Sequence, residues 1–419
     1  MLNPARHGRV AALAVTLLLA GCGSPASPVA RATQTPTGSA PAATPPSESA
    51  SAAPTALPTP TPKPAPPALV ALTGLSATNV LTIRLVGLDG TVVASTPVSA
   101  PISGWVKSGP DGAYWLDTGG ALHRLGRDGG VTTVARMPTG AYFAVGASGR
   151  IAYVTSPFMA PQTTPPTTDN RLYLVSSGAV QLLADRPTTG TMDGAGNVPG
   201  IPPYDWSYDP VTWTGGGLLI ARLPQGRCGC GPFGMETVQG YTAIVDPATG
   251  LAGSVTDDPN CPVSGVAADG TSACFHTPVI PTSKNEGRGA DALRILRGGK
   301  VVQSFDLSTQ NAAGDATFNA DSTRLAYATV TAGSDCGTWQ TLTRLRVLDL
   351  VSGTAKAVGP AGLQPVGWLA NGRLVATSVT GDPAAPQTGV VIVDPATGAV
   401  QPVPSTQSAG TQLLGLVTA

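Results

Sequence analysis

The chain is poor in charge, in aromatic side chains and in histidine. Charged residues make up 11% of its 419 residues, aromatic residues make up 5%, and there are three histidines. Ordinary soluble domains carry about 25% charged residues. Lys and Arg number 24, as do Asp and Glu, so the net charge is zero. Because a balanced chain has no basic surface to attract nucleic acid or an anionic membrane, we expect no nucleic-acid partner.

Motifs of the common catalytic sites are missing too. The chain has no Gly-x-Ser-x-Gly nucleophile elbow, no phosphate-binding glycine loop and no His-Glu-x-x-His zinc motif. Beyond the N-terminal segment, the histidines are His123, most simply a half-exposed strand residue, and His276. We therefore expect no catalytic residue, no cofactor and no metal, and we favour a protein that is not an enzyme.

Long apolar runs and helical periodicity are also scarce. Beyond the N-terminal segment, no stretch is long and apolar enough for a transmembrane helix, and none keeps a 3.6-residue pattern. Gly (52) and Pro (41) are abundant, and apolar residues make up 42%, which is enough for a substantial core. These features together predict an all-β, turn-rich fold.

The first residues have the features of a lipoprotein signal peptide, which we place at 1–21. Arg6 and Arg9 precede an apolar run from Val10 to Ala20, which is too short to span a bilayer. The run ends in Leu-Ala-Gly-Cys22, which resembles the lipobox that the lipoprotein signal peptidase reads. The resemblance implies cleavage before Cys22 and a diacylglycerol (palmitate-type) anchor on it, hence an extracytoplasmic, membrane-attached protein. An ordinary secretory peptide with an incidental cysteine is the alternative.

A tether follows at 22–67. Gly23 to Pro67 holds 13 prolines among Ser, Thr and Ala and almost no large apolar side chain. Such a segment cannot bury enough surface to offset its chain entropy, so we expect it to be disordered and extended, holding the folded region away from the membrane.

The region 68–419 repeats one unit: two short strands around a tight turn, a loop, and two more strands around a second turn. Asp, Asn and Pro begin these turns and Gly follows. First turns include 109–112, 146–149, 268–270, 319–322 and 370–372; second turns include 246–250, 349–353 and 394–398. Repeated four-stranded units predict the blades of a β-propeller.

The segment from Thr317 to Tyr327, Thr-Phe-Asn-Ala-Asp-Ser-Thr-Arg-Leu-Ala-Tyr, resembles a hairpin of TolB-like and other WD-type propellers. Here Asn-Ala-Asp-Ser stands where that family has Ser-Pro-Asp-Gly, and the resemblance speaks only to fold. Units begin near Ile102, Ala141, Val211, Val263, Ala316 and Gln364. A seventh forms if three strands from 69–96 pair with one from 411–417, which closes the ring without an open edge. We predict seven blades, with six or eight as alternatives.

Nearly all insertions fall on one face of such a ring. The first and second turns are short, whereas long connections occupy 156–170, 186–209, 223–239, 277–290, 331–341 and 380–388. Loops on a rigid scaffold commonly bind partners, although surface loops also tolerate neutral insertion. Tyr204, Asp205, Trp206, Tyr208 and Trp339 lie in or beside these loops and are our candidate contacts for a protein or a glycan. The alternative is that such aromatics pack beneath their own loops.

Five cysteines beyond Cys22 are disulfide candidates: Cys228, Cys230, Cys261, Cys274 and Cys336. All map to the long-loop face. Cys261 and Cys274 flank one hairpin and can pair, Cys336 can then take Cys228 or Cys230, and one thiol is left over. A metal site from Cys228, Cys230, Cys274 and His276 is the minor alternative.

The resulting functional hypothesis is a lipid-anchored propeller that binds a protein or glycan through its long-loop face. Two alternatives stay open. One is an extracytoplasmic glycan hydrolase or lyase with carboxylates assembled from separate blades. The other is a structural component of the cell envelope.

Overall fold

The computed structural model describes residues 67–75, 80–98, 102–146, 149–155, 171–176, 178–184, 208–224, 233, 240–256, 258, 260–277, 290–308, 310, 312–330, 339–381, 387–407 and 411–418. The predicted signal peptide, Cys22 and nearly all of the tether lie outside these residues. Within them, no helix is long and apolar enough to cross a bilayer. Helix is limited, in the same residues, to short 3-10 turns such as η4 (Trp339–Leu342).

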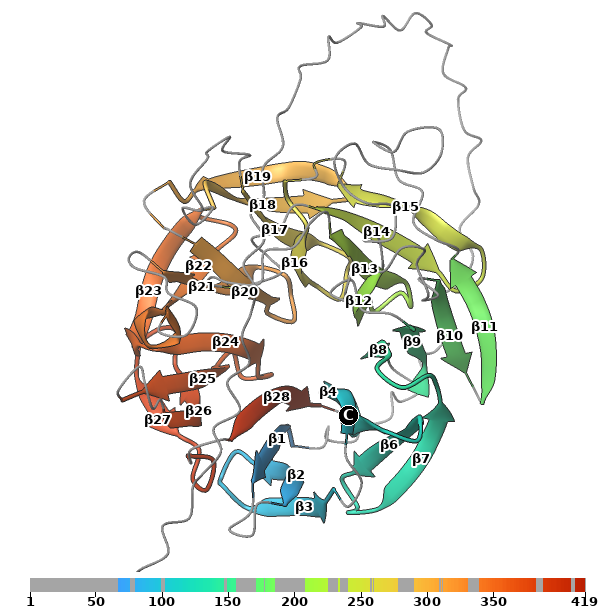
Figure 1. Cartoon of the computed structure of the whole chain (residues 1–419). Coiled ribbons are helices and arrows are strands. Elements are labelled where there is room, and N and C mark those ends of the chain that lie inside the picture. The colour runs from blue at the N-terminus through green and yellow to red at the C-terminus, as the bar shows by residue number, and fades with distance from the viewer. Residues whose placement is uncertain are drawn as a thin grey trace, which may run out of the picture. The chain divides into compact units, whose positions relative to one another are not determined.

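The strands form seven antiparallel sheets of four, arranged in a ring (Figure 1). Blade 1 combines β28 (Gln412–Val417) with β1 (Leu69–Leu75), β2 (Leu81–Gly87) and β3 (Val92–Pro97). Blade 2 contains β4 (Ile102–Gly109), β5 (Gly112–Asp117), β6 (Ala121–Gly126) and β7 (Val131–Arg136), and blade 3 contains β8 (Tyr142–Val145), β9 (Ile151–Val154), β10 (Leu172–Ser176) and β11 (Ala179–Ala184). Blade 4 contains β12 (Asp209–Trp213), β13 (Leu219–Pro224), β14 (Gly240–Asp246) and β15 (Gly250–Thr256).

Blade 5 contains β16 (Val263–Val266), β17 (Ser272–His276), β18 (Ala292–Arg297) and β19 (Lys300–Asp306). Blade 6 contains β20 (Ala312–Phe318), β21 (Arg324–Val330), β22 (Arg344–Asp349) and β23 (Thr354–Ala361), and blade 7 contains β24 (Leu363–Trp368), β25 (Leu374–Thr380), β26 (Gln387–Val393) and β27 (Val400–Pro402). The prediction of a seven-bladed propeller is confirmed. We letter the strands of each blade A to D from the axis outward, so that β28, β4, β8, β12, β16, β20 and β24 are the A strands (Figure 1).

Blade 1 closes the ring by pairing the two ends of the chain. β1 pairs with β28 in antiparallel register, with Leu69 opposite Val417 and Thr73 opposite Gln412. The sheet has the order β28, β1, β2, β3, so β28 completes a blade whose other three strands come from the beginning of the folded region. The predicted joining of 69–96 with 411–417 is therefore confirmed, and it removes the exposed edge that an open sheet would present.

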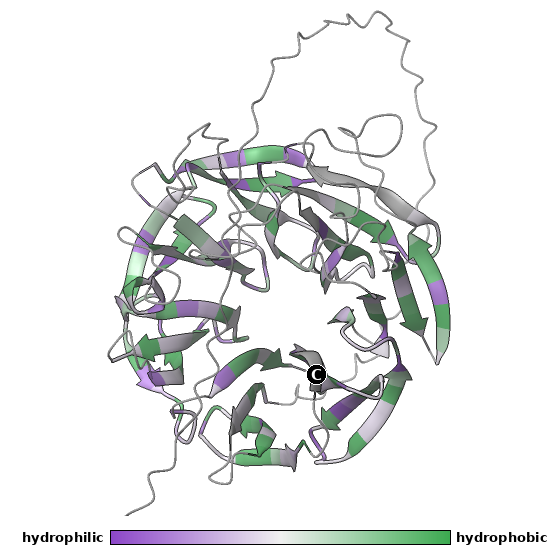
Figure 2. Ribbon diagram, viewed as in Figure 1, coloured by the Kyte–Doolittle hydropathy of each residue, from purple (hydrophilic) through white to green (hydrophobic). Residues whose placement is uncertain are grey.

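The core consists of apolar layers between neighbouring blades. A cluster of buried side chains joins each adjacent pair; blades 1 and 2, for example, share Leu69, Ile83, Trp115, Leu125 and Val417. Equivalent clusters join the other pairs around the ring and complete the circle between blades 7 and 1. Hydrophobic residues lie along the strands around the ring (Figure 2), and an inner strand such as β9 is buried at every position, because both of its faces pack against neighbouring blades.

Tryptophans on A strands also connect blades through hydrogen bonds. The indole Nε1 of Trp213 donates to the Ala144 carbonyl at 3.5 Å, and that of Trp368 donates to the Thr317 carbonyl at 3.0 Å. Both indoles therefore connect one blade to the next. The side chain of Trp105, the third residue of this group, lies outside the described atoms.

Carboxylates organise the short turns. In the turn after β26, Asp394 Oδ1 accepts the backbone N–H of Ala396 at 2.7 Å, and Gly398 adopts a φ of 75° that glycine tolerates best. Between β20 and β21, Ser322 stands where the resembling hairpin has Gly and takes a φ of 58°. There Asp321 Oδ1 accepts the Thr323 backbone N–H at 3.1 Å. Side-chain caps of this kind offset the strain of a non-glycine residue.

These caps predict an acid-sensitive stability. The backbone N–H of Ala396, followed by that of Thr397, holds the pKa of Asp394 below its usual 3.8, and hydrogen bonds do the same for Asp349 and Asp89. A lowered carboxyl pKa stabilises the fold above the unfolded-state value, and this contribution is lost as pH falls below about 4. We expect Asp394→Asn to lower the urea midpoint at about pH 6 and to match the wild type at about pH 2.5. An equal difference at both values would contradict the assignment.

Arg127 clamps the closure from the neighbouring blade. It lies in the C–D turn of blade 2, where its Nη1 donates to the Pro67 carbonyl at 2.7 Å and its Nη2 donates to the Val417 carbonyl at 2.9 Å. One guanidinium thus holds Pro67, two residues before β1, and the last residue of β28. Because β1 is a B strand, both contacts lie at the end of the blades that carries the short turns.

We expect Arg127→Met to lower the free energy of unfolding by about 1–3 kcal/mol, because two charge-assisted hydrogen bonds disappear and two carbonyls lose their donor. Arg136→Met is the matched control, since Arg136 is exposed at the end of β7 in the same blade. The control is expected to stay within about 0.5 kcal/mol of the wild type. Urea unfolding of both variants measures the difference, and equal effects would remove the role assigned to Arg127.

Candidate functional site

The two ends of the ring differ in the length of their connections. A–B and C–D connections leave one end, which we call the short-turn face, and the longest of them joins β26, ending at Val393, to β27, beginning at Val400. B–C and D–A connections leave the other end, the long-loop face. The longest of these span 155–171, 185–208, 225–239, 277–291 and 331–343. The predicted one-sided distribution of insertions therefore follows from the strand order.

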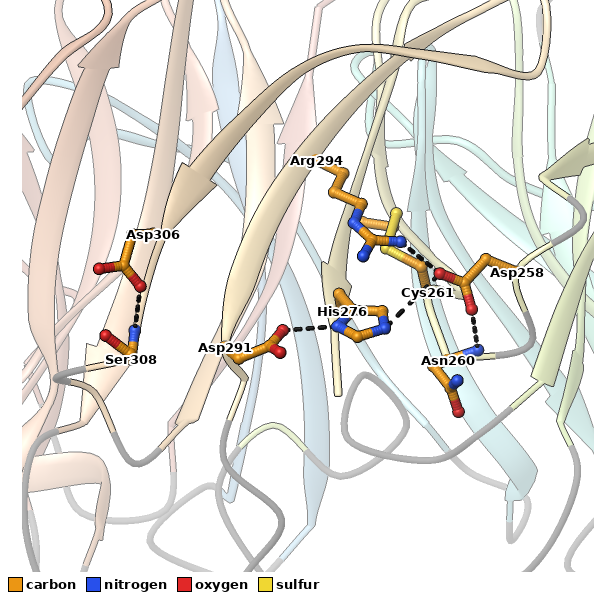
Figure 3. A network of polar contacts seen from close by, with 9 residues as sticks. Asp258, Asn260, Cys261, His276, Asp291, Arg294, Asp306 and Ser308 are labelled. Carbon is orange, nitrogen blue, oxygen red and sulfur yellow. Dashed lines mark hydrogen bonds and ion pairs between the residues drawn. A yellow bond between two sulfur atoms is a disulfide. The ribbon is translucent and has the colours of Figure 1, made fainter. Parts of the chain in front are cut away.

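A polar network occupies the long-loop end of blade 5 (Figure 3). His276 is the last residue of β17, and its Nδ1 lies 2.5 Å from Oδ1 of Asp291, which immediately precedes β18. On the other side of the imidazole, Nε2 of His276 lies 3.6 Å from Oδ2 of Asp258, which belongs to the D–A connection before β16. Arg294 of β18 donates to the same Oδ2 through Nη1. The B–C connection of blade 5 and the D–A connection from blade 4 to blade 5 thus meet around a single imidazole.

A disulfide fixes the connection that carries Asp258. Cys261 and Cys274 are bonded, with sulfurs 2.06 Å and Cα atoms 5.2 Å apart. Both are buried against Leu296, with exposed fractions of 0% and 1%. Asp258 Oδ1 also accepts the backbone N–H of Asn260 at 2.9 Å. The pair that the sequence suggested therefore ties the D–A connection to β17, next to the network.

The network can bind polar groups at its open side. The His276 side chain is 15% exposed, whereas that of Asp291 is 44% exposed and faces solvent. The imidazole faces one carboxylate with each of its nitrogens, and Arg294 balances part of the negative charge. Sequence reasoning picked out His276 but missed Asp258, Asp291 and Arg294, because their proximity depends on how separate strands align.

The minor metal alternative loses one of its ligands. It required Cys274 as a thiolate beside His276, and Cys274 is bonded to Cys261. Among the residues that the structure describes, no group of three or more His, Cys, Asp or Glu side chains is arranged to hold a metal ion. Cys228, Cys230 and Cys336 lie outside those residues, so their pairing stays a prediction.

The candidate contact residues fall into three groups. Tyr204, Asp205 and Trp206 lie outside the described residues. Tyr208 is 2% exposed and packs with Leu219 and Ala221 against blade 3, so its side chain has almost no surface to offer a partner. Trp339 in η4 is half-buried and remains on the long-loop face, where its ring packs against Phe233 with centroids 4.9 Å apart. Trp339 therefore packs beneath its own loops and still keeps part of its surface exposed.

The other described histidine, His123, is held within blade 2. Its Nε2 lies 3.0 Å from Oδ2 of Asp117, Thr133 Oγ1 lies 3.2 Å from its Nδ1, and the Trp115 ring lies 5.3 Å away. The hydrogen bond from His123, followed by the backbone N–H of Ala121, lowers the pKa of Asp117. The His123 side chain is 21% exposed, and its contacts with Asp117 and Thr133 connect neighbouring strands of the blade.

Charged groups also gather near the axis. Asp209 of β12 and Arg222 of β13 form an ion pair, with Oδ2 and Nε 3.5 Å apart. Burial lowers the pKa of Lys107 on β4, the Asp209 charge opposes this effect, and the Arg222 charge adds to it. Lys107 in blade 2 and Asp209 in blade 4 are thus close enough for their charges to interact. The trio joins one carboxylate to two cations, which differs from the carboxylate pair of a glycosidase.

Comparisons with known proteins agree with the fold and go no further. No family model matches the chain, and no curated protein matches its sequence. TolB from Acinetobacter baumannii is similar over 84% of this chain and 66% of its own, with 11% identity and a TM-score of 0.42. This chain thus spans about two thirds of the length of that protein.

Two further solved structures cover more of their own chains. The β-propeller domain of the Trilobed protease from Pyrococcus furiosus is similar over 82% of this chain and 94% of its own, with 8% identity and a TM-score of 0.48. A putative TolB from Agrobacterium tumefaciens is similar over 84% and 98%, with 11% identity and a TM-score of 0.38. The expected likeness to TolB-like propellers is confirmed at the level of fold.

Proposed function

We propose that the protein is an extracytoplasmic lipoprotein whose propeller binds a partner through the long-loop face. The observation that carries this proposal is the separation of two features on the ring. The tether joins the propeller at Pro67, which Arg127 holds on the short-turn face. The strands leave for the five long connections at the opposite end, where Trp339 also lies. A domain attached in this way leaves its long-loop face free to meet a partner.

Two further features support this reading. The lipobox-like sequence before Cys22 favours acylation, and an acylated tether of about 45 residues gives the domain a long reach. The Cys261–Cys274 disulfide suits an oxidising compartment outside the cytoplasm. Neither feature identifies the partner.

Acylation is tested by Cys22→Ser in the native host. We expect the variant to lose metabolic labelling with a palmitate analogue, to keep its signal peptide uncleaved by the lipoprotein peptidase, and to leave the membrane fraction that holds the wild type. Ser24→Ala, two residues further on, is the matched control and is expected to behave as the wild type. Unchanged labelling of Cys22→Ser would refute the anchor.

Partner binding is tested by photo-crosslinking in living cells. Leu342 in η4 is 45% exposed on the long-loop face, and Val351 is 84% exposed in the C–D turn of the same blade. A photoreactive phenylalanine at position 342 is expected to form discrete adducts, whereas the same residue at position 351 forms none. Adducts of equal yield at both positions, or none at either, would contradict binding by the long-loop face.

A further inference from the structure

β1 is an inner strand of blade 1 and is hydrogen-bonded along both of its edges. It lies between β28 and β2 in the sheet, and Figure 1 shows it beside β28. It pairs with β28 from Leu69 to Thr73 and with β2 from Leu69 to Leu75. The strand that follows the tether is therefore held on two sides from its first residue. We call β1 with these two neighbouring strands the β1 clamp.

The side chains of β1 are buried in the layers on both sides of the blade. Leu69 and Ala71 belong to the layer between blades 1 and 2, whereas Val70 and Leu72 belong to the layer between blades 7 and 1. None of the four is more than 3% exposed. Because successive side chains point to opposite faces, β1 cannot slide along its own axis without moving apolar side chains through both close-packed layers.

The tether and the long-loop face lie at opposite ends of β1. The strand begins at Leu69 on the short-turn face, where Arg127 holds Pro67. It ends at Leu75, from which a B–C connection leaves on the long-loop face. Hydrogen bonds between antiparallel strands run perpendicular to the strands. Tension between the tether and the long-loop face therefore runs along β1 and loads all the hydrogen bonds of both ladders at the same time.

Force in another direction opens the same pairing much more easily. Leu69 and Val417 lie opposite each other, so the beginning of β1 and the end of β28 are at the same end of the sheet. Force that draws these two residues apart separates the strands from that end. Their hydrogen bonds then break one after another, and each bond in turn carries the whole load.

From this arrangement we infer that the β1 clamp is a mechanical attachment point. It withstands tension between the tether and a partner on the long-loop face, and it yields to tension between the beginning of β1 and the end of β28. The inference rests on the proposed function, because the membrane anchor and the partner define the direction of the load. A propeller attached in this way stays folded while its partner pulls on it.

The inference is tested by single-molecule force spectroscopy on the chain from residue 22 onward. One handle is attached at position 51 in the tether. The other is attached through an azide-bearing phenylalanine in place of Gln412 or Thr418, which are both exposed and lie at opposite ends of β28. At equal loading rates, we expect the first rupture to need a several-fold higher force with the handle at 412 than at 418.

A handle at position 342 applies the load that a partner would apply. Leu342 is exposed on the long-loop face, in a different blade from the clamp. We expect its first rupture force also to exceed that from position 418. This second comparison keeps the test valid if the azide at position 412 lowers the urea midpoint of the protein.

Arg127 gives a further readout of direction. It holds the carbonyls of Pro67 and Val417 together at the end where the strands would begin to separate. We expect Arg127→Met to lower the rupture force from position 418 and to leave that from position 412 nearly unchanged, because the whole ladder shares the load there. Arg136→Met is the control and is expected to change neither force. An equal loss in both directions overturns the inference.

Failure of the inference is distinguishable from failure of the proposed function. Equal rupture forces from positions 412 and 418, or a higher force from 418, overturn the β1 clamp and leave the lipid anchor and the binding face standing. Palmitate labelling that survives Cys22→Ser, or absence of every adduct from position 342, overturns the proposed function. The difference between the two rupture forces would persist in that case, because it depends only on the pairing of β1.

Discussion

Val417→Asp is expected to lower the free energy of unfolding by more than about 3 kcal/mol, because it places a carboxylate among the apolar side chains of the layer between blades 1 and 2. Val417 is fully buried at the end of β28 and packs with Leu69, Trp115 and Leu125. It lies opposite Leu69 in the pairing that closes the ring. A charge at this point therefore acts on the one sheet that joins both ends of the chain.

The loss should extend beyond the substituted site. If β28 is displaced, β1 presents an unpaired edge. The apolar layers on both sides of blade 1 then lose the side chains that β28 contributes to them. We expect a lower denaturation midpoint, faster proteolysis between 67 and 98, and a tendency to associate through the open edge. Urea unfolding and limited proteolysis measure these effects.

Gln412→Asp is the matched control for this prediction. Gln412 lies on the same strand, is exposed, and pairs with Thr73. The same new side chain at this position is expected to change stability by no more than about 0.5 kcal/mol. Similar losses for both variants would mean that β28 does not close the ring through its buried face.

Much of this architecture can be predicted from local signals. Turns such as 394–398 combine Asp, Pro and Gly in an order that has few alternative conformations, and they separate strands whose residues favour β structure. Each hairpin is thus readable on its own, and the repeat places the beginning of each blade within a few residues. The joining of 411–417 to 69–75 follows by elimination, since three strands at one end and one at the other complete a single blade.

Features that depend on alignment between strands are not readable in this way. β20 carries a register shift between Gly314 and Thr317, and similar irregularities occur in the A strands of other blades. Nothing in the local pattern distinguishes these bulges from regular pairing. The His276 network could not be predicted for the same reason. Asp258, His276 and Asp291 come from three segments, and strand length and twist decide whether these segments come close to one another.

The contact of Phe233 with blade 6 is hidden for a different reason. A long connection has many possible courses, and its sequence does not state which neighbour it reaches. The sequence suggested aromatic contacts on this face, and it placed Trp339 on the correct end of the ring. The sequence did not reveal which of these aromatic side chains is exposed. Trp339 keeps some exposed surface, whereas Tyr208 is buried in the layer between blades 3 and 4.

The Cys261–Cys274 disulfide is expected to contribute about 3 kcal/mol, the value for a loop of this length in the chain-entropy description. The two residues are 13 positions apart and enclose β16, the A–B turn and the beginning of β17. We expect the double variant Cys261→Ala with Cys274→Ala to show this loss in urea unfolding. Alanine is the better replacement, because both positions are almost fully buried beside Leu296 and would leave a serine hydroxyl without a partner.

The single variants supply the control within the same pair. Because breaking either half removes the whole bond, Cys261→Ala and Cys274→Ala should each cost nearly as much as the double variant. Costs that add would mean that the two cysteines contribute as separate buried side chains. Hydrogen exchange gives a local check: the amides of Asn260, Cys261 and Val263 should lose protection in all three variants, because the bond holds the connection of Asp258 against β17. If protection there did not change, the disulfide would not be what positions the carboxylate that His276 and Arg294 share.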